Sequence, residues 1–505
     1  MTPVPTAAHA QPLDLTAQQT PTHTSAANAS ISESLDRLDR LDVVLPTVNV
    51  ISFAGPGESG GVPASLAPIV QRLGTRVNWF AISDLPKPLE KKGDKRGAVR
   101  NESGFAYYSP KVADWLINAH YEVSHDYLSP LLHSRGEEPG AGTQKFEPES
   151  WKSYRQLCEA VASECLTVAS NSFPTLCWLH DYQLALAAPL LAAQAGLILC
   201  QFWHVPWPKA AVIKESPIGR ELTEALLKNK LVGFHTDEYA DNFMDTVAAI
   251  LPTAQVNCQA RSIVYDGRRT QLTVMPLGID LPFWQRLAQA SKPHSESLIP
   301  RHSLASQIIL GVERLEQTKG VIERIAGIER LLEDHPTHRR RFHYVQISQP
   351  GKGVGAEARA YEELVEARIE AVNKKYFQDG WQPIIHIKGN LEQSQLAAWY
   401  QAATAISVNS LSDGLNLIAK EYVACRADEQ GVVILSRQAG ASRELAQGAL
   451  LVDPASPKSV SDAFNLALGL ESEEKRRRMS AMRRMIGWNQ LHNWALGFLR
   501  QALSQ

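Results

Sequence analysis

Residues 175–208 read TLCWLHDYQLALAAPLLAAQAGLILCQFWHVPWP. Leu176–Leu179 and Leu197–Trp203 are short apolar runs typical of buried strands, and Gln183–Ala195 between them predicts a helix. A strand, a helix and a second strand in this order indicate a βαβ unit, in which the two strands lie parallel in one sheet. The stretch therefore predicts an α/β fold.

The same alternation continues on both sides of this stretch. Val48–Phe53 predicts an earlier strand, and Gln307–Val312 restarts the pattern after the polar, proline-bearing residues 290–303. We therefore expect two Rossmann-like, doubly wound halves facing a cleft, with ligands beyond the carboxyl ends of the strands. The expected parts of the chain are a disordered tail over 1–47, a first domain over 48–290, a second domain over 303–480, and a C-terminal helix over 481–505 that crosses back to the first domain.

Composition excludes several classes of protein. The 505 residues carry a formal net charge of −2, whereas wholesale nucleic-acid binding needs a strongly basic surface. The six cysteines show no CxxC spacing, so we expect neither a zinc site nor a redox pair. The apolar run 185–203 is interrupted by Pro189, Gln194 and Gly196, so we expect no membrane span there. A cytoplasmic globular enzyme is the favoured class.

The first 30 residues differ from the rest of the chain. They contain no Lys or Arg, one acid (Asp14), and mostly Thr, Ala, Pro, Gln and Ser. So little apolar surface cannot offset the entropy of ordering. The tail is either a flexible extension or an export signal of the kind found in type III secreted effectors, which would place the protein inside a host cell.

Polar side chains follow two neighbouring strands of the predicted sheet. Asp181 in His180–Gln183 follows the first strand, where a carboxylate can accept hydrogen bonds from ligand hydroxyls or simply cap a helix. His204 follows the second, ahead of two prolines that turn the chain out of the sheet. The two positions predict a polar site at this edge of the sheet.

The segment ERLEQTKG (313–320) follows the first strand of the second half. Arg314 offers a fork of donors and Lys319 a point charge, which together suit a diphosphate. The alternative is an exposed basic helix start.

The segment SLSDGLNLIAKE (410–421) combines an Asp-Gly turn with the start of a helix. The free backbone N–H groups at such a helix start can hold a phosphate or a sugar hydroxyl. Read alone, the Asp-Gly pair is only a turn signal.

Taken in order, these segments resemble the trehalose-6-phosphate synthase family, retaining glycosyltransferases of the GT-B fold, over about residues 48–505. The matching pieces are Ser59-Gly60-Gly61, WLHDYQL (178–184), FWHVPWP (202–208), GFHTDEYADNF (233–243), MPLGID (275–280), ERLEQTKG (313–320), SDGLNLIAKEY (412–422) and LSRQAGASREL (435–445). The resemblance implies a first domain that binds the acceptor and a second that binds the nucleotide sugar.

The resemblance also implies a role for each matching residue. The catalytic group would be Arg314, Lys319, His204 and Asp181, with Tyr121 and Asp181 binding the acceptor. The donor-binding residues would be Gly60, Gly61, Arg314, Lys319, Asp413, Gly414, Leu415, Asn416, Leu417 and Glu421. No metal or cofactor is implied, because Arg and Lys balance the charge of the leaving group. The partners would be small molecules, UDP-, ADP- or GDP-glucose and a sugar phosphate, with no nucleic acid, no membrane and a homo-oligomer as a further option.

Three positions depart from the family pattern on the acceptor side and beside the donor loop. Ala54 and Ser412 stand where the family usually has Arg, and Ser129 where it has Trp. The leading hypothesis is glucosyl transfer to glucose 6-phosphate, giving trehalose 6-phosphate. The alternatives are a glucosylglycerol-phosphate synthase that uses ADP-glucose and glycerol 3-phosphate, and a catalytically inactive sugar-phosphate sensor.

Overall fold

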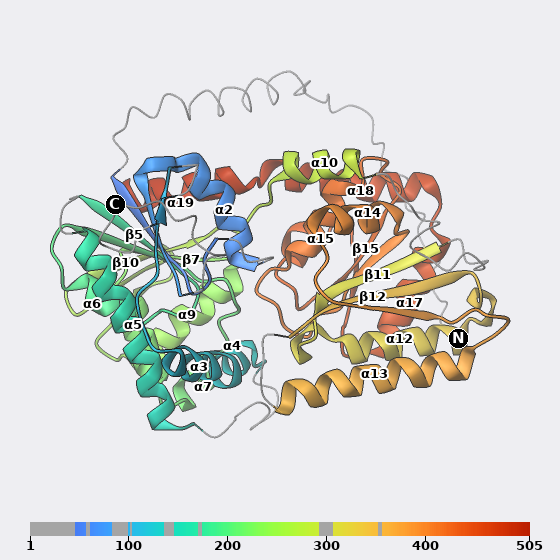
Figure 1. Cartoon of the computed structure of the whole chain (residues 1–505), viewed down its shortest axis with the longest axis horizontal. Helices are drawn as coiled ribbons and strands as arrows, with labels where there is room; N and C mark the ends of the chain where they lie inside the picture. The colour runs from blue at the N-terminus through green and yellow to red at the C-terminus, as the bar shows by residue number, and fades with distance from the viewer. Residues whose placement is uncertain are drawn as a thin grey trace, which may run out of the picture. The chain divides into compact units, whose positions relative to one another are not determined.

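The computed structural model describes residues 46–56, 61–82, 99–100, 104–135, 146–169, 174–291, 307–351 and 356–504. The predicted tail, apart from Pro46 and Thr47, and most of the predicted linker at 290–303 lie outside these residues. Residues 46–505 form one compact unit. It contains two sheets (Figure 1).

Among the described residues, ten strands form the first sheet in the order β3-β4-β2-β1-β5-β6-β7-β10-β9-β8. The strands from β4 to β10 in this order pair in parallel, while β3 pairs antiparallel with β4, and β8, β9 and β10 form an antiparallel edge. Their bounds are β1 Thr47–Ile51, β2 Val77–Phe80, β3 Val99–Arg100, β4 Ala106–Tyr108, β5 Thr175–His180, β6 Leu197–Phe202, β7 Leu231–Phe234, β8 Gln255–Asn257, β9 Ser262–Tyr265 and β10 Arg268–Val274.

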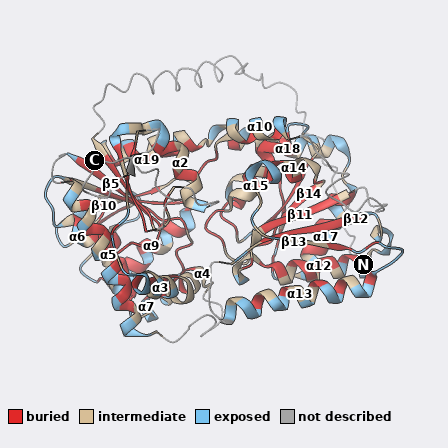
Figure 2. Cartoon of the chain, viewed as in Figure 1, coloured by how far each residue is buried: buried red, intermediate tan, exposed pale blue. Residues whose placement is uncertain are grey.

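The second sheet is parallel throughout its six described strands, in the order β13-β12-β11-β14-β15-β16. Its strands are β11 Gln307–Arg314, β12 Phe342–Gln349, β13 Ile384–Lys388, β14 Ala405–Val408, β15 Val432–Ser436 and β16 Leu450–Val452. Both sheets are buried under helices (Figure 2), as expected for parallel strands that are apolar on both faces.

Helices cover the two sheets. Those in the first part of the chain are α2 Gly61–Leu73, α3 Asp114–Glu122, α4 Ser129–His133, α5 Pro148–Ala169, α6 Ala187–Ala192, α7 Ala210–Glu215, α8 Gly219–Leu226 and α9 Asp237–Ile250. The later ones are α10 Leu281–Ala290, α12 Val321–Asp334, α13 Ala356–Tyr376, α14 Gln393–Ala402, α15 Leu417–Cys425, α16 Ser442–Leu445, α17 Pro457–Gly469, α18 Ser472–Trp488 and α19 Leu491–Ser504.

The predicted helix over Gln183–Ala195 is wrong in length. Its helical core is only α6, Ala187–Ala192, and the residues before it form hydrogen-bonded turns. Pro189 lies in the first turn of α6, where a missing N–H costs nothing because those donors have no helical partner anyway. Gly196, with φ 86°, then turns the chain into β6.

The chain crosses between the two sheets twice, and the two crossings lie side by side. Ile279, on the way to α10, pairs with Gln490, just before α19. α19 then packs on the first sheet: the Trp494 ring lies 5.5 Å from that of Trp178 and 4.8 Å from that of Phe202. The carboxyl ends of β5 and β6 are thereby fixed relative to the second sheet.

A buried ion pair supports the end of β11. The guanidinium of Arg324 on α12 donates to both carboxylate oxygens of Glu313 at 2.6 and 3.0 Å, and to the Tyr344 hydroxyl at 2.8 Å. The side chains of Arg324 and Glu313 are 0% and 7% exposed. Glu313 immediately precedes Arg314, so this pair fixes the backbone from which Arg314 projects.

We predict that Arg324→Ala lowers the free energy of unfolding by about 3–5 kcal/mol, because it leaves the buried Glu313 carboxylate without its partner. Arg330→Ala on the same helix removes an exposed, solvent-screened ion pair with Asp334 and should leave the stability almost unchanged. Urea denaturation of the two variants measures both costs. Equal costs would contradict this assignment.

Candidate functional site

One cleft brings together residues that follow the strands of both sheets. Described residues line it, and its volume is about 280 Å³. Its lining includes Gly61, Asp181, His204, Arg314, Lys319, Asp413, Gly414, Leu415, Asn416, Leu417 and Glu421. We call it the main cleft. Of the residues expected in the site, Gly60 lies outside the described residues and Tyr121 does not line the cleft.

Lys319 and Asp413 form an ion pair at the centre of this cleft. The Lys319 Nζ lies 2.9 Å from Asp413 Oδ2, and the two side chains are 14% and 12% exposed. The same carboxylate oxygen accepts from Ser410 Oγ and Asn416 Nδ2, both at 3.1 Å. Burial opposes ionisation of Asp413, but the Lys319 charge and these donors prevail and lower its pKa. The carboxylate is therefore ionised and oriented.

Arg314 is the second cation of the cleft. Its Nε donates to Glu316 Oε1 at 2.8 Å, and its side chain is 30% exposed. Burial alone would lower the pKa of Arg314, but the Glu316 carboxylate outweighs it and raises that pKa. Arg314 and Lys319 thus both face the cleft as cations that already have carboxylate partners.

The loops after β14 and β15 are each packed too tightly for a side chain at one position. A Cβ at Gly414 would lie 2.0 Å from the backbone oxygen of His204, and one at Gly440 would lie 2.1 Å from the backbone oxygen of Gly414. Tyr239 on α9 also donates its hydroxyl to the Asp413 backbone oxygen at 3.1 Å. The loop that carries Asp413 is therefore held directly against the first half of the chain.

The same loop ends in a capped helix start. Asn416 has φ 80° and its side-chain oxygen accepts from the backbone N–H of Ala419 at 3.3 Å, which caps α15. The first backbone N–H groups of a helix have no partner within the helix, so they are available to an anion or a hydroxyl. Leu417 and Ile418, at the start of α15, line the cleft.

Asp181 adopts a left-handed backbone conformation, with φ 64°. This conformation is uncommon for a residue with a side chain, and such strain concentrates at functional sites. Two contacts hold it: Asp181 Oδ1 accepts from the His204 backbone N–H at 3.2 Å, and the Asp181 backbone oxygen accepts from Gln201 Nε2 at 2.9 Å. The carboxyl lines both the main cleft and a side pocket that includes Ser52, Phe53 and Ala54.

Three buried histidines pack beneath Asp181. His204 Nε2 lies 3.1 Å from His180 Nδ1, and the His204 ring is 5.2 Å from that of His235. Burial lowers the pKa of His204 to about 3, so this imidazole is neutral at physiological pH. Among the described residues, no group of three or more His, Cys, Asp or Glu side chains is arranged to hold a metal ion. His180 and His235 belong to the sequence motifs given above, but the motifs did not predict a part in the site for either of them.

Glu421 also lines the main cleft, just over one turn into α15. Its Oε2 accepts from the Tyr400 hydroxyl at 3.0 Å. Burial raises the pKa of Glu421 to about 7, and the Tyr400 hydrogen bond only partly opposes this. The group therefore titrates near neutral pH.

The acceptor-side positions are distributed over neighbouring surfaces. The Tyr121 ring lies 4.2 Å from that of His125, which does line the main cleft, and 6.1 Å from that of Phe53 in the side pocket. Ser129 lines the main cleft and Ala54 the side pocket. Ser412 faces neither, although it is adjacent to Asp413.

Comparison with known proteins gives one family. The model of glycosyltransferase family 20 matches residues 52–504. A trehalose-6-phosphate synthase from Mycobacterium sp. (strain JLS) is 31% identical over 453 residues, which cover 87% of this chain and 90% of that protein. A bifunctional trehalose-6-phosphate synthase/phosphatase from Thermoproteus tenax is 31% identical over 436 residues, 85% of this chain but only 57% of that longer protein.

A solved structure shares the fold. An alpha,alpha-trehalose-phosphate synthase (UDP-forming) from Burkholderia xenovorans, in complex with glucose-6-phosphate, superposes with a TM-score of 0.82 at 26% identity, covering 90% of this chain and 100% of that one. The expected fold class, two Rossmann-like sheets of the GT-B type, is thus confirmed. With its family model matching nearly the whole folded chain, the protein belongs to glycosyltransferase family 20.

Proposed function

We propose that the protein transfers glucose from UDP-glucose to glucose 6-phosphate, with retention of configuration, and so makes trehalose 6-phosphate. The observation that carries the proposal is the meeting, in one cleft, of the Arg314 and Lys319 cations with Asp181 and His204 from the other half. The relatives act as trehalose-6-phosphate synthases, which supports the same donor and acceptor here.

On the donor side, the diphosphate binds to the two cations of the main cleft, Arg314 and Lys319. Lys319 is held by Asp413 and Arg314 by Glu316, so both cations are positioned before the donor arrives. Positioned charges need little reorganisation as the phosphate leaves, which is the most effective form of electrostatic catalysis. The start of α15 and Asp413 hold the glucose, and Glu421 holds the ribose hydroxyls.

On the acceptor side, Asp181 accepts hydrogen bonds from sugar hydroxyls and neutral His204 lies beside the donor glucose. The acceptor hydroxyl oxygen bonds to the anomeric carbon on the face from which the diphosphate leaves. The bond from that carbon to the phosphate oxygen breaks, and the leaving phosphate oxygen takes the acceptor proton. Since the leaving group acts as the base, the reaction relies on positioning and charge.

This reaction requires no metal or other cofactor, because Arg314 and Lys319 supply the positive charge. Across the described residues, no helix is both long and apolar enough to cross a lipid bilayer. Cytoplasmic location, homo-oligomer formation and type III secretion by the tail stay predictions.

We predict that the purified protein releases UDP from UDP-glucose when glucose 6-phosphate is present, and that a chelator such as EDTA does not change the rate. Coupled UDP detection measures turnover, with ADP- and GDP-glucose as alternative donors and glycerol 3-phosphate as the alternative acceptor. Faster turnover with glycerol 3-phosphate would replace the proposed acceptor. Binding without release for every pair would make the protein a sensor.

We predict that Arg314→Ala lowers kcat/KM for UDP-glucose by at least about 100-fold, because two charge-assisted hydrogen bonds worth about 1.5–3 kcal/mol each are lost. Arg314→Lys keeps the positive charge but lacks the two parallel donors of the guanidinium. Its kcat/KM should lie between that of Arg314→Ala and that of the wild type. Arg330→Ala, an exposed arginine in the same half, is the matched control. Unchanged kcat/KM in Arg314→Ala would remove this residue from the donor clamp.

We predict that the KM for UDP-glucose falls as pH rises from about 6 to about 8 and then levels off. The pKa of Glu421 is about 7 without donor, and only the ionised carboxylate accepts from two ribose hydroxyls, so below about 7 a proton must be released on binding. The dependence is at most about tenfold per pH unit. Glu421→Gln should weaken donor binding and remove this part of the pH dependence. An identical pH profile in the variant would contradict the assignment.

A further inference from the structure

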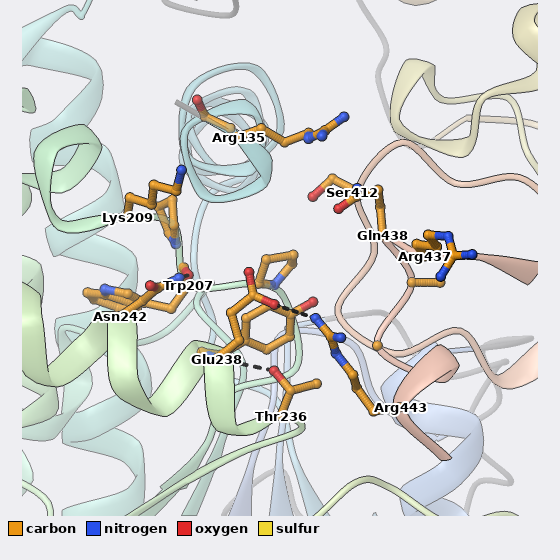
Figure 3. A pocket seen from close by; sticks show the side chains of 16 residues that line it. Arg135, Trp207, Lys209, Thr236, Glu238, Asn242, Ser412, Arg437, Gln438 and Arg443 are labelled. Carbon is orange, nitrogen blue, oxygen red and sulfur yellow. Dashed lines mark hydrogen bonds and ion pairs between the residues drawn. The ribbon is translucent and has the colours of Figure 1, made fainter. Parts of the chain in front are cut away.

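A second hollow lies between the two halves, behind the loop that carries Asp413. We call it the basic hollow; its lining includes Arg135, Lys209, Glu238, Ser412, Arg437 and Arg443 (Figure 3). Its volume is about 170 Å³, several times the roughly 30 Å³ that one water molecule occupies in the liquid. It therefore has room for a polyatomic ligand.

Positive charge predominates in this hollow. Four basic side chains line it, while Glu238 is the one carboxylate among its lining residues in the described chain. Glu238 is paired with Arg443 at 2.7 Å, and both side chains are more than half exposed, so solvent screens this pair and an anion can exchange with it. Because the whole chain carries a net charge of only −2, this excess is local.

The charges come from both halves of the chain. Arg135 follows α4 and Lys209 precedes α7, whereas Arg437 follows β15 and Arg443 lies on α16. Figure 3 shows Arg443 and Glu238 meeting in the hollow, with Lys209 and Arg135 on its other side. An anion seated here contacts both halves at once.

The basic hollow is separate from the main cleft. Neither Arg314 nor Lys319 lines it, and the loop backbone forms the wall between the two spaces. The Asp413 backbone oxygen accepts from Tyr239 and from the Gly440 N–H, so this wall is fixed at its centre. Ser412 faces the basic hollow while Asp413 faces the main cleft, so an occupant of the hollow contacts the residue next to the donor ligand.

We propose that the basic hollow is a binding site for a small phosphorylated anion that bridges the two halves of the protein. Arginine forks and a lysine ammonium are the groups that bind phosphate best, and here they converge from four points of the chain on a concave surface. Thr236, which caps the 14-residue helix α9, also lines this hollow and offers a hydroxyl group. The proposal is independent of the reaction catalysed in the main cleft.

The test is calorimetric titration of the full-length protein with pyrophosphate at constant ionic strength. Arg314→Ala weakens the donor clamp, which is the other place where pyrophosphate can bind. Arg135→Ala combined with Lys209→Ala removes two charges from the basic hollow. Lys214→Ala combined with Arg269→Ala removes two exposed charges elsewhere in the same half and is the matched control.

We expect Arg314→Ala to keep one binding event with an unchanged Kd, and the Arg135/Lys209 variant to weaken that event at least about tenfold. The Lys214/Arg269 control should bind as the wild type does. Loss of all binding in Arg314→Ala would assign pyrophosphate to the donor clamp and overturn the proposal. The proposal would also be overturned if pyrophosphate binding weakened equally in both double variants, or if the protein bound no pyrophosphate outside the donor clamp.

Discussion

The geometry of the site depends on a contact between two backbones. Gly414 lies so close to the His204 carbonyl that a single methyl group would collide with it at 2.0 Å, and Gly440 packs against Gly414 in the same way. Three chain segments from three loops are thus stacked without intervening side chains. This stack sets how near the Asp413 loop comes to Asp181, because Asp413 immediately precedes Gly414 while Asp181 accepts a hydrogen bond from His204. Interiors packed to this density transmit small shifts instead of absorbing them.

The charged groups of the main cleft are also held in position by their neighbours. The cations of the main cleft are held by carboxylates, and burial keeps the imidazole of His204 neutral. Glu313, in the lining of the same cleft, is neutralised by Arg324. Under the proposed function, a negatively charged diphosphate would meet cations that are already held in position. The buried Arg324–Glu313 pair serves positioning, since a buried ion pair gives little net stability over an apolar replacement of the same shape.

Much of the fold and the composition of the cleft could be predicted from sequence. Strand–helix alternation is a local signal that can be read from the sequence. Residues that follow parallel strands meet at one edge of the sheet, so the sequence predicts that Asp181, His204, Arg314 and the Asp413 loop lie together.

The rest of the site depends on tertiary contacts. The left-handed conformation of Asp181 needs hydrogen bonds from Gln201 and His204, and the short α6 follows from the turns before Pro189. Ser412 and Asp413 face different spaces because of the path of their loop. The periodicity of the sequence does not predict the path of a loop. Strands β8 and β9 at the antiparallel edge are not predicted for a similar reason: they have three and four residues, are partly exposed, and show a weak apolar pattern.

The position of α19 has a consequence for how the protein is made. Trp494 and Phe498 cover Trp178 and Phe202 in the first sheet, yet they are synthesised only after the whole second sheet. During translation the first sheet leaves the ribosome long before its covering helix is synthesised. The part of its core that Trp494 and Phe498 cover cannot close before α19 has been synthesised, so the first sheet cannot finish folding ahead of the second half. The newly made first half must remain with exposed aromatic surface throughout synthesis of the second, the interval in which a chaperone would be needed.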